Sequence, residues 1–166
     1  VHLYQDSHQQ SHWSFWYIEG QATFFELAMA NLLLGTNKIR SDYLFVNRPM
    51  QDTHVFEPTS PEYVAQYFDD CYRGTKGSCK AFEYTVGSMF HEKLVIDYGL
   101  DAYWDWQDYL NSNMPKGQMG DFSIDQQEQA RVVFGQSFVD VFGISRETFE
   151  TEVMATYVFE YFTQAP

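Results

Sequence analysis

The chain has 166 residues, a length that fits one domain with a substantial hydrophobic core. Apolar residues make up 45% of it and aromatic residues 19%, which excludes a disordered polypeptide. Asp and Glu number 23 against 10 Lys and Arg, and a net charge of -13 repels phosphate backbones, so nucleic acid is not an expected partner. No apolar run approaches the roughly 18 residues of a membrane-spanning helix, so no transmembrane segment is predicted.

The N-terminal stretch contains a histidine and a carboxylate of the kinds that bind metals. His2 lies in Val1-His-Leu-Tyr-Gln5, and Glu19 lies in the first turn of a helix predicted over 16–34 from its apolar spacing. Imidazole nitrogen and carboxylate oxygen are ordinary zinc ligands. A terminal histidine needs no metal, however, and a carboxylate is favoured in a first helical turn by the helix dipole alone.

Two other residues of this predicted helix bear on the same site. Gly20 lowers helix stability by about 1 kcal/mol relative to Ala, so we expect it to allow close approach of the helix that carries His2. Glu26 lies seven residues after Glu19 on the same face. It is either an acid that supports a metal ligand or a polar helix edge.

Residues 36–60 are predicted to be mostly a connecting loop, with one short extended segment at 43–46. His54 in this loop is a candidate substrate contact or a structural histidine. A helix from 61 to about 72 follows, because Ser60 can cap it and Pro61 favours the first helical position.

Two cysteines, Cys71 and Cys79, flank a glycine-containing loop that can bring them together. We expect a local disulfide, with two free thiols in a reducing compartment as the alternative. A disulfide would indicate an extracellular or periplasmic protein.

The rest of the chain also has helical spacing. A helix from 82 to Tyr98-Gly99 is followed by a short aromatic-rich helix within 101–110, a helix over 123–142 with a capping-box pattern, and a last helix capped by Ser145. The prediction is an all-α single domain, 1–166, of about six helices with at most one short extended segment.

The opening stretch resembles the gluzincin-type zinc metallopeptidases. Val1-His2-Leu-Tyr4-Gln5 is similar to the end of their His-Glu-x-x-His motif, and Trp16-Tyr-Ile-Glu19-Gly20-Gln-Ala22 is similar to the Trp-x-x-Glu-Gly-x-Ala context of their glutamate ligand. The resemblance implies that His2 and Glu19 bind zinc, that 1–5 ends the active-site helix, and that 61–164 is the helical bundle of the C-terminal subdomain.

The motif is incomplete in this sequence. Its first histidine and its catalytic glutamate would precede Val1, so the chain looks processed or truncated and is not expected to hydrolyse peptides alone. An upstream half-domain or a partner chain is expected to supply them.

A second similarity lies in Glu83-Tyr84-Thr-Val-Gly87, which resembles the Tyr-x-x-Gly segment of the aminopeptidase branch. It implies that the Tyr84 hydroxyl stabilises the oxyanion, with core packing as the alternative. His91 could contact substrate instead, although we expect an exposed helix position for it. The implied function is zinc-dependent hydrolysis of a peptide or protein substrate. The alternative is a non-catalytic helical binding or assembly module that retains the same scaffold.

Overall fold

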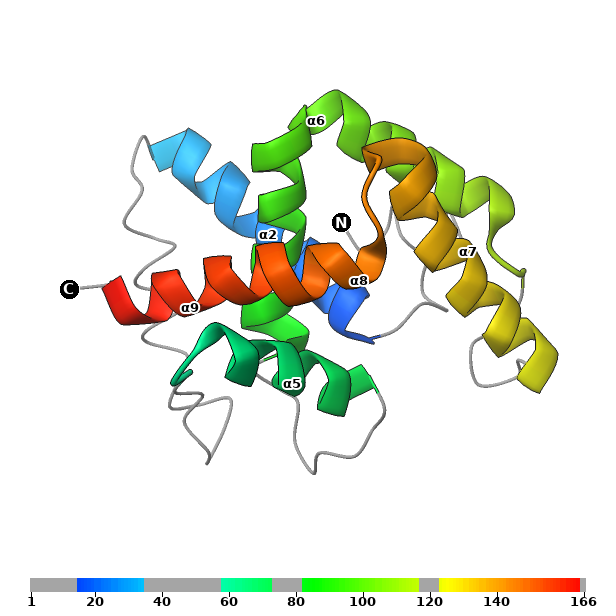
Figure 1. The fold of residues 1–166 in the computed structure, drawn as a ribbon. Coiled ribbons are helices and arrows are strands. Elements are labelled where there is room, and N and C mark those ends of the chain that lie inside the picture. The colour runs from blue at the N-terminus through cyan, green and yellow to red at the C-terminus, as the bar shows by residue number, and fades with distance from the viewer. Residues whose placement is uncertain (1–14, 35–57, 73–81, 117–122, 165–166) are drawn as a thin grey trace.

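The computed structural model describes residues 15–34, 58–72, 82–116 and 123–164. All regular structure in these ranges is helical (Figure 1), which confirms the predicted all-α class for this part of the chain. The expected extended segment at 43–46 and the helix end at 1–5 lie outside the described residues.

Two of the helical segments have the wider turns of a π-helix. The elements in chain order are α2 (Phe15–Leu34), α5 (Pro61–Tyr72), the π-helical η2 (Phe82–Val86), α6 (Gly87–Asn113), α7 (Ile124–Phe142), the short α8 (Arg146–Thr148), the π-helical η4 (Phe149–Met154) and α9 (Ala155–Gln164). The predicted helices 16–34, 61–72 and 123–142 are confirmed to within one residue at either end.

Local capping chemistry sets several of these ends. Ser60 Oγ accepts the backbone N–H of Tyr63 at 3.2 Å, which caps α5. Ser123 and Gln126 each accept the other's backbone N–H in a capping box at the start of α7. Gly143 ends α7 in the left-handed conformation, with φ 71°.

Helix α6 bends at Gly99, where the sequence predicted one helix to end and another to follow. The backbone there has φ 86° and ψ 165°, a conformation that favours glycine. Figure 1 shows the two halves of α6 running in different directions. In a straight helix, twelve residues would separate His91 from Tyr103 by about 18 Å. The bend brings their side chains within hydrogen-bonding distance, 2.9 Å.

Aromatic rings fill the centre of the molecule. Trp106 on the second half of α6 lies 5.4 Å from Phe138 and 5.8 Å from Phe134 of α7, measured between ring centroids. Phe149 of η4 joins this cluster 5.5 Å from Phe138. On the other side of α6, α5 packs against η4 and α9, and α9 crosses in front of α6 (Figure 1). The core therefore ties the second half of α6 to α7 and the C-terminal helices.

Candidate functional site

Helix α2 crosses the junction of η2 and α6 at a pair of glycines. A Cβ atom built on Gly20 would lie 2.4 Å from the carbonyl carbon and 2.6 Å from the Cα of Gly87. Real Cβ atoms do not approach other heavy atoms this closely, so no side chain fits here unless the helices separate. Gly20 therefore allows a close approach, and its partner is the start of α6. The helix predicted to carry His2, the expected partner, lies outside the described residues.

Two of the predicted site residues, Glu19 and Tyr84, lie close to these glycines in the sequence. Glu19 directly precedes Gly20, and Tyr84 in η2 lies three residues before Gly87. Both glycines are buried, whereas the side chains of Glu19 and Tyr84 are partly exposed. Since α2 packs on η2, Glu19 and Tyr84 lie on two elements that contact each other, and each side chain is partly exposed.

The prediction of an exposed position for His91 is wrong. His91 is fully buried on α6. Its Nε2 lies 3.0 Å from the carbonyl oxygen of Tyr17, and its Nδ1 lies 2.9 Å from the hydroxyl of Tyr103. Because a carbonyl only accepts, Nε2 carries the hydrogen and Nδ1 accepts from Tyr103. With both nitrogens bonded inside the core, His91 is not placed to contact a substrate.

Burial also determines the charge of this histidine. Removal from water lowers the pKa of His91 to about 3, and the hydrogen bond to the Tyr17 carbonyl opposes this shift only in part. The ring is therefore neutral at neutral pH.

His91 belongs to a buried polar network between α2 and α6. The Tyr17 hydroxyl donates to Gln107 Oε1 at 2.7 Å. Gln21 Nε2 lies 3.0 Å from both the Tyr103 hydroxyl and Gln107 Oε1, and donates toward both. All of these side chains are buried. The sequence carries a signal for this network. On each helix, two polar residues lie four apart on a face that is otherwise apolar: Tyr17 and Gln21 on α2, and Tyr103 and Gln107 on α6.

Other predicted site residues are more distant or undescribed. Glu26 is exposed on α2, two turns beyond Glu19. His2, His54, Cys79 and the side chain of Cys71 lie outside the described residues. Within the described ranges, no three His, Cys, Asp or Glu side chains are grouped to hold a metal ion. The zinc ligand set and the disulfide therefore stay predictions.

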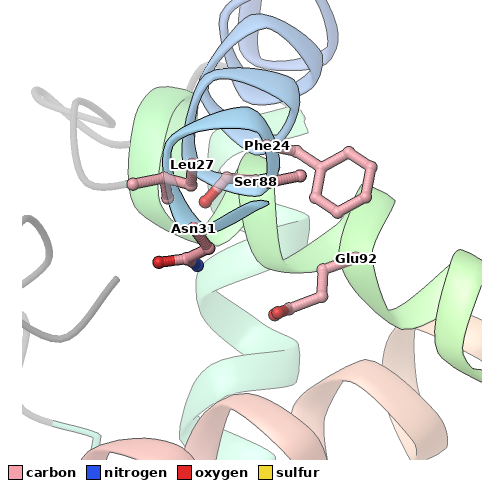
Figure 2. Close-up of a pocket in the computed structure, with 6 residues that line it drawn as sticks. Phe24, Leu27, Asn31, Ser88 and Glu92 are labelled. Atoms are coloured by element: carbon pink, nitrogen blue, oxygen red, sulfur yellow. The ribbon is translucent and has the colours of Figure 1, made fainter. Parts of the chain in front are cut away.

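A small pocket opens beside the crossing, between α2 and the first half of α6 (Figure 2). Its volume is about 60 Å³, and its lining consists of Phe24, Leu27, Ala28, Asn31, Ser88 and Glu92. This volume holds a few water molecules but is far below the roughly 300 Å³ of an ordinary ligand site. The pocket is therefore too small to be a substrate cleft.

Comparison of the chain with protein-family models, with curated proteins and with solved structures finds no match. Among the helices that the structure describes, none combines the length and apolar character needed to cross a membrane. The gluzincin resemblance rests on the sequence motifs alone.

Proposed function

We propose that this chain is the C-terminal helical part of a gluzincin-type zinc metallopeptidase domain, which hydrolyses a peptide or protein substrate. An upstream segment or a partner chain would supply the remaining zinc histidine and the general base. The observation that supports this proposal is the contact between Gly20 and Gly87, each close in sequence to one of the proposed site residues Glu19 and Tyr84, whose side chains are partly exposed.

One proposed zinc ligand, Glu19, lies among the described residues, and its carboxylate is a group that zinc binds. Glu19 is partly exposed, and His2, which lies outside the described residues, would add a nitrogen. Zinc, when bound, acts as a Lewis acid toward the scissile carbonyl. The Tyr84 hydroxyl would donate a hydrogen bond to the oxygen on which negative charge develops.

The surrounding structure suits groups that must be held in place. Catalytic side chains work when their geometry is kept within about 0.5 Å, and sites on helices are more rigid than sites on loops. The glycine contact sets the distance between α2 and α6, and the buried network below it joins the same two helices. Glu19 therefore lies on a helix that is firmly packed on α6, and Tyr84 lies in η2, which directly precedes α6.

The first test is the zinc affinity of the full-length natural polypeptide. Glu19→Gln keeps the size of the side chain but removes its charge, and should weaken zinc binding by about tenfold or more, the loss known even for residues that only support metal ligands. Glu152→Gln, an exposed acid in η4, is the matched control and should bind zinc as the wild type does. An unchanged zinc affinity in Glu19→Gln would contradict the proposal.

The second test separates binding from catalysis. Tyr84→Phe should retain zinc and KM but lower kcat on peptide substrates by about 10²- to 10³-fold, the usual loss for one oxyanion donor. If the full-length protein binds no zinc, hydrolyses no peptide and keeps its thermal stability in chelator, the alternative function, a non-catalytic helical module, is correct.

A further inference from the structure

Large apolar side chains are exposed where α2 meets the second half of α6. On α2, Leu32 and Leu33 are 75% and 76% exposed, and Met29 is 51% exposed. On α6, Leu100 is 48% and Trp104 is 37% exposed. Together with the partly exposed Phe25 of α2, these residues form what we call the α2–α6 apolar surface.

An aromatic pair joins the two helices within this surface. Phe25 stacks on Trp104, with ring centroids 5.6 Å apart and planes inclined by 18°. Eight residues earlier on α2, the Tyr17 hydroxyl bonds to Gln107, which lies three residues later on α6. The two helices therefore run in opposite directions along this contact.

The opposite directions make the apolar surface continuous. Met29 lies one turn after Phe25, and Leu100 lies one turn before Trp104, so both extend from the aromatic pair toward the same end. At 100° per residue, the surface residues of α2 fall within an arc of about 100°. Leu100 and Trp104 likewise lie about 40° apart on α6.

Carboxylates border this surface on both helices. The exposed acids are Glu26 on α2 and Asp101, Asp105 and Asp108 on α6. Glu26 lies about 60° round α2 from Met29, and the three aspartates lie within about 100° of Trp104. Neither helical stretch, 15–34 or 99–113, contains a Lys, Arg or His. The border is therefore uniformly negative.

This combination of chemistry selects one kind of partner. An apolar surface with a polar border marks an interaction site. A second copy of the chain would bring like charges together, and anionic lipid headgroups would be repelled. An amphipathic helix that carries Lys and Arg beside its apolar face matches both the surface and its border.

We propose that the α2–α6 apolar surface docks a basic amphipathic helix of another protein. The apolar face of that helix covers Met29, Leu100 and the aromatic pair, and its cations meet the bordering carboxylates. The inference does not rest on the proposed function, because neither Glu19 nor Tyr84 belongs to this surface.

The experiment measures binding of a fluorescein-labelled peptide to the full-length natural polypeptide by anisotropy. The probe is a helical peptide of about 14 Leu and Lys residues, with all Leu on one face, about 21 Å long. One control peptide has Glu in place of Lys, and another has the same composition in an order that gives no apolar face. The probe should bind at least about tenfold more tightly than either control. Equal affinity for either control would overturn the inference.

Substitutions then locate the binding. Met29→Gln and Leu100→Gln, on the two helices, should each raise the Kd of the probe by about tenfold, as loss of an apolar anchor does. Val132→Gln is the matched control, because Val132 is 57% exposed on α7 and lies outside the surface. It should leave the Kd unchanged, and equal losses at Val132 and Met29 would overturn the inference.

The negative border is tested separately. Asp105→Asn should raise the Kd by about threefold at about 0.05 M salt, and the difference should disappear at about 0.5 M. Asp125→Asn, an exposed acid at the start of α7, is the control. Equal effects at the two positions would show attraction to the overall charge of -13 in place of docking on this surface, and would overturn the inference.

Three outcomes with Met29→Gln would assign another occupant and overturn the inference. The first is a dimer of the wild type in sedimentation velocity that the variant does not form. The second is wild-type binding to phosphatidylcholine vesicles that the variant loses. The third is a fall in Tm of more than about 2 °C, since a substitution on an uncovered surface changes stability little. We expect none of these, because the side chain is open to solvent.

Discussion

Gly20 and Gly87 touch backbone to backbone, with space at Gly20 for a hydrogen atom but not for a methyl group. Gly20→Ala should therefore lower the free energy of unfolding by about 1–3 kcal/mol, the usual effect of overpacking. This loss outweighs the gain of about 1 kcal/mol that alanine brings to a helix. Urea denaturation followed by circular dichroism measures the change.

Gly135 provides the matched control for that substitution. It lies inside α7, and a Cβ atom built on it would meet nothing within 4 Å. Gly135→Ala should raise the free energy of unfolding by about 0.5–1 kcal/mol, because only helix propensity and unfolded-state entropy change. The same sign of change at both glycines would show that the contact with Gly87 does not limit what fits at Gly20.

The bend of α6 depends on Gly99 for a different reason. Space is open around it, but its φ of 86° with ψ of 165° is a conformation that other residues rarely adopt. Gly99→Ala should lower the free energy of unfolding by about 1–3 kcal/mol through backbone strain alone. A calorimetric Tm equal to that of the wild type would show that α6 can bend without glycine.

Acid should destabilise the fold through His91. Its pKa is lowered from 6.5 to about 3, so below pH 6.5 the unfolded chain binds a proton that the folded chain does not. The stability contributed by neutral His91 is fully present above that pH. It is lost as pH falls toward 3, at up to about 1.4 kcal/mol per pH unit.

His91→Gln isolates this effect, because the carboxylates that also titrate in acid are common to both proteins. The free energy of unfolding of the wild type minus that of the variant should become smaller with each step from pH 7.5 to 6 and 5. Parallel stability curves across this range would mean that His91 is not held neutral by burial.

The sequence was sufficient for the helix ends because their chemistry is local. The bonds at Ser60 and Ser123 join residues three apart, so a short window contains both partners. Gly99 and Gly143 likewise act through their own backbone angles. These features need no knowledge of the tertiary fold.

The burial of His91 could not be found in this way. Its partner Tyr17 lies 74 residues away, and its partner Tyr103 comes within reach only because α6 bends. A polar residue on a helix looks solvent-exposed until the partners that compensate for its burial are known. The residues of the candidate site could be predicted only where they match a known sequence motif. One of them, the proposed ligand His2, lies outside the described residues.

The last prediction compares two hydrogen bonds of equal length and chemistry. The Tyr157 hydroxyl donates to Glu92 Oε2 at 2.9 Å in a partly buried position, and the Tyr109 hydroxyl donates to Asp140 Oδ2 at 2.9 Å at the surface. A bond to a charged group gains strength as water is excluded. Burial should therefore decide which bond contributes more to stability.

Tyr157→Phe should lower the free energy of unfolding by about 1–2 kcal/mol, and Tyr109→Phe by about 0.5 kcal/mol or less. Each change removes one oxygen and keeps the ring, so the contact of Lys93 Nζ with the Tyr157 ring, 5.2 Å to its centroid, remains. A double-mutant cycle with Glu92→Ala, which removes the acceptor, isolates the coupling between the two side chains. Equal losses for the two tyrosines would show that the bond between α9 and α6 gains nothing from its partial burial.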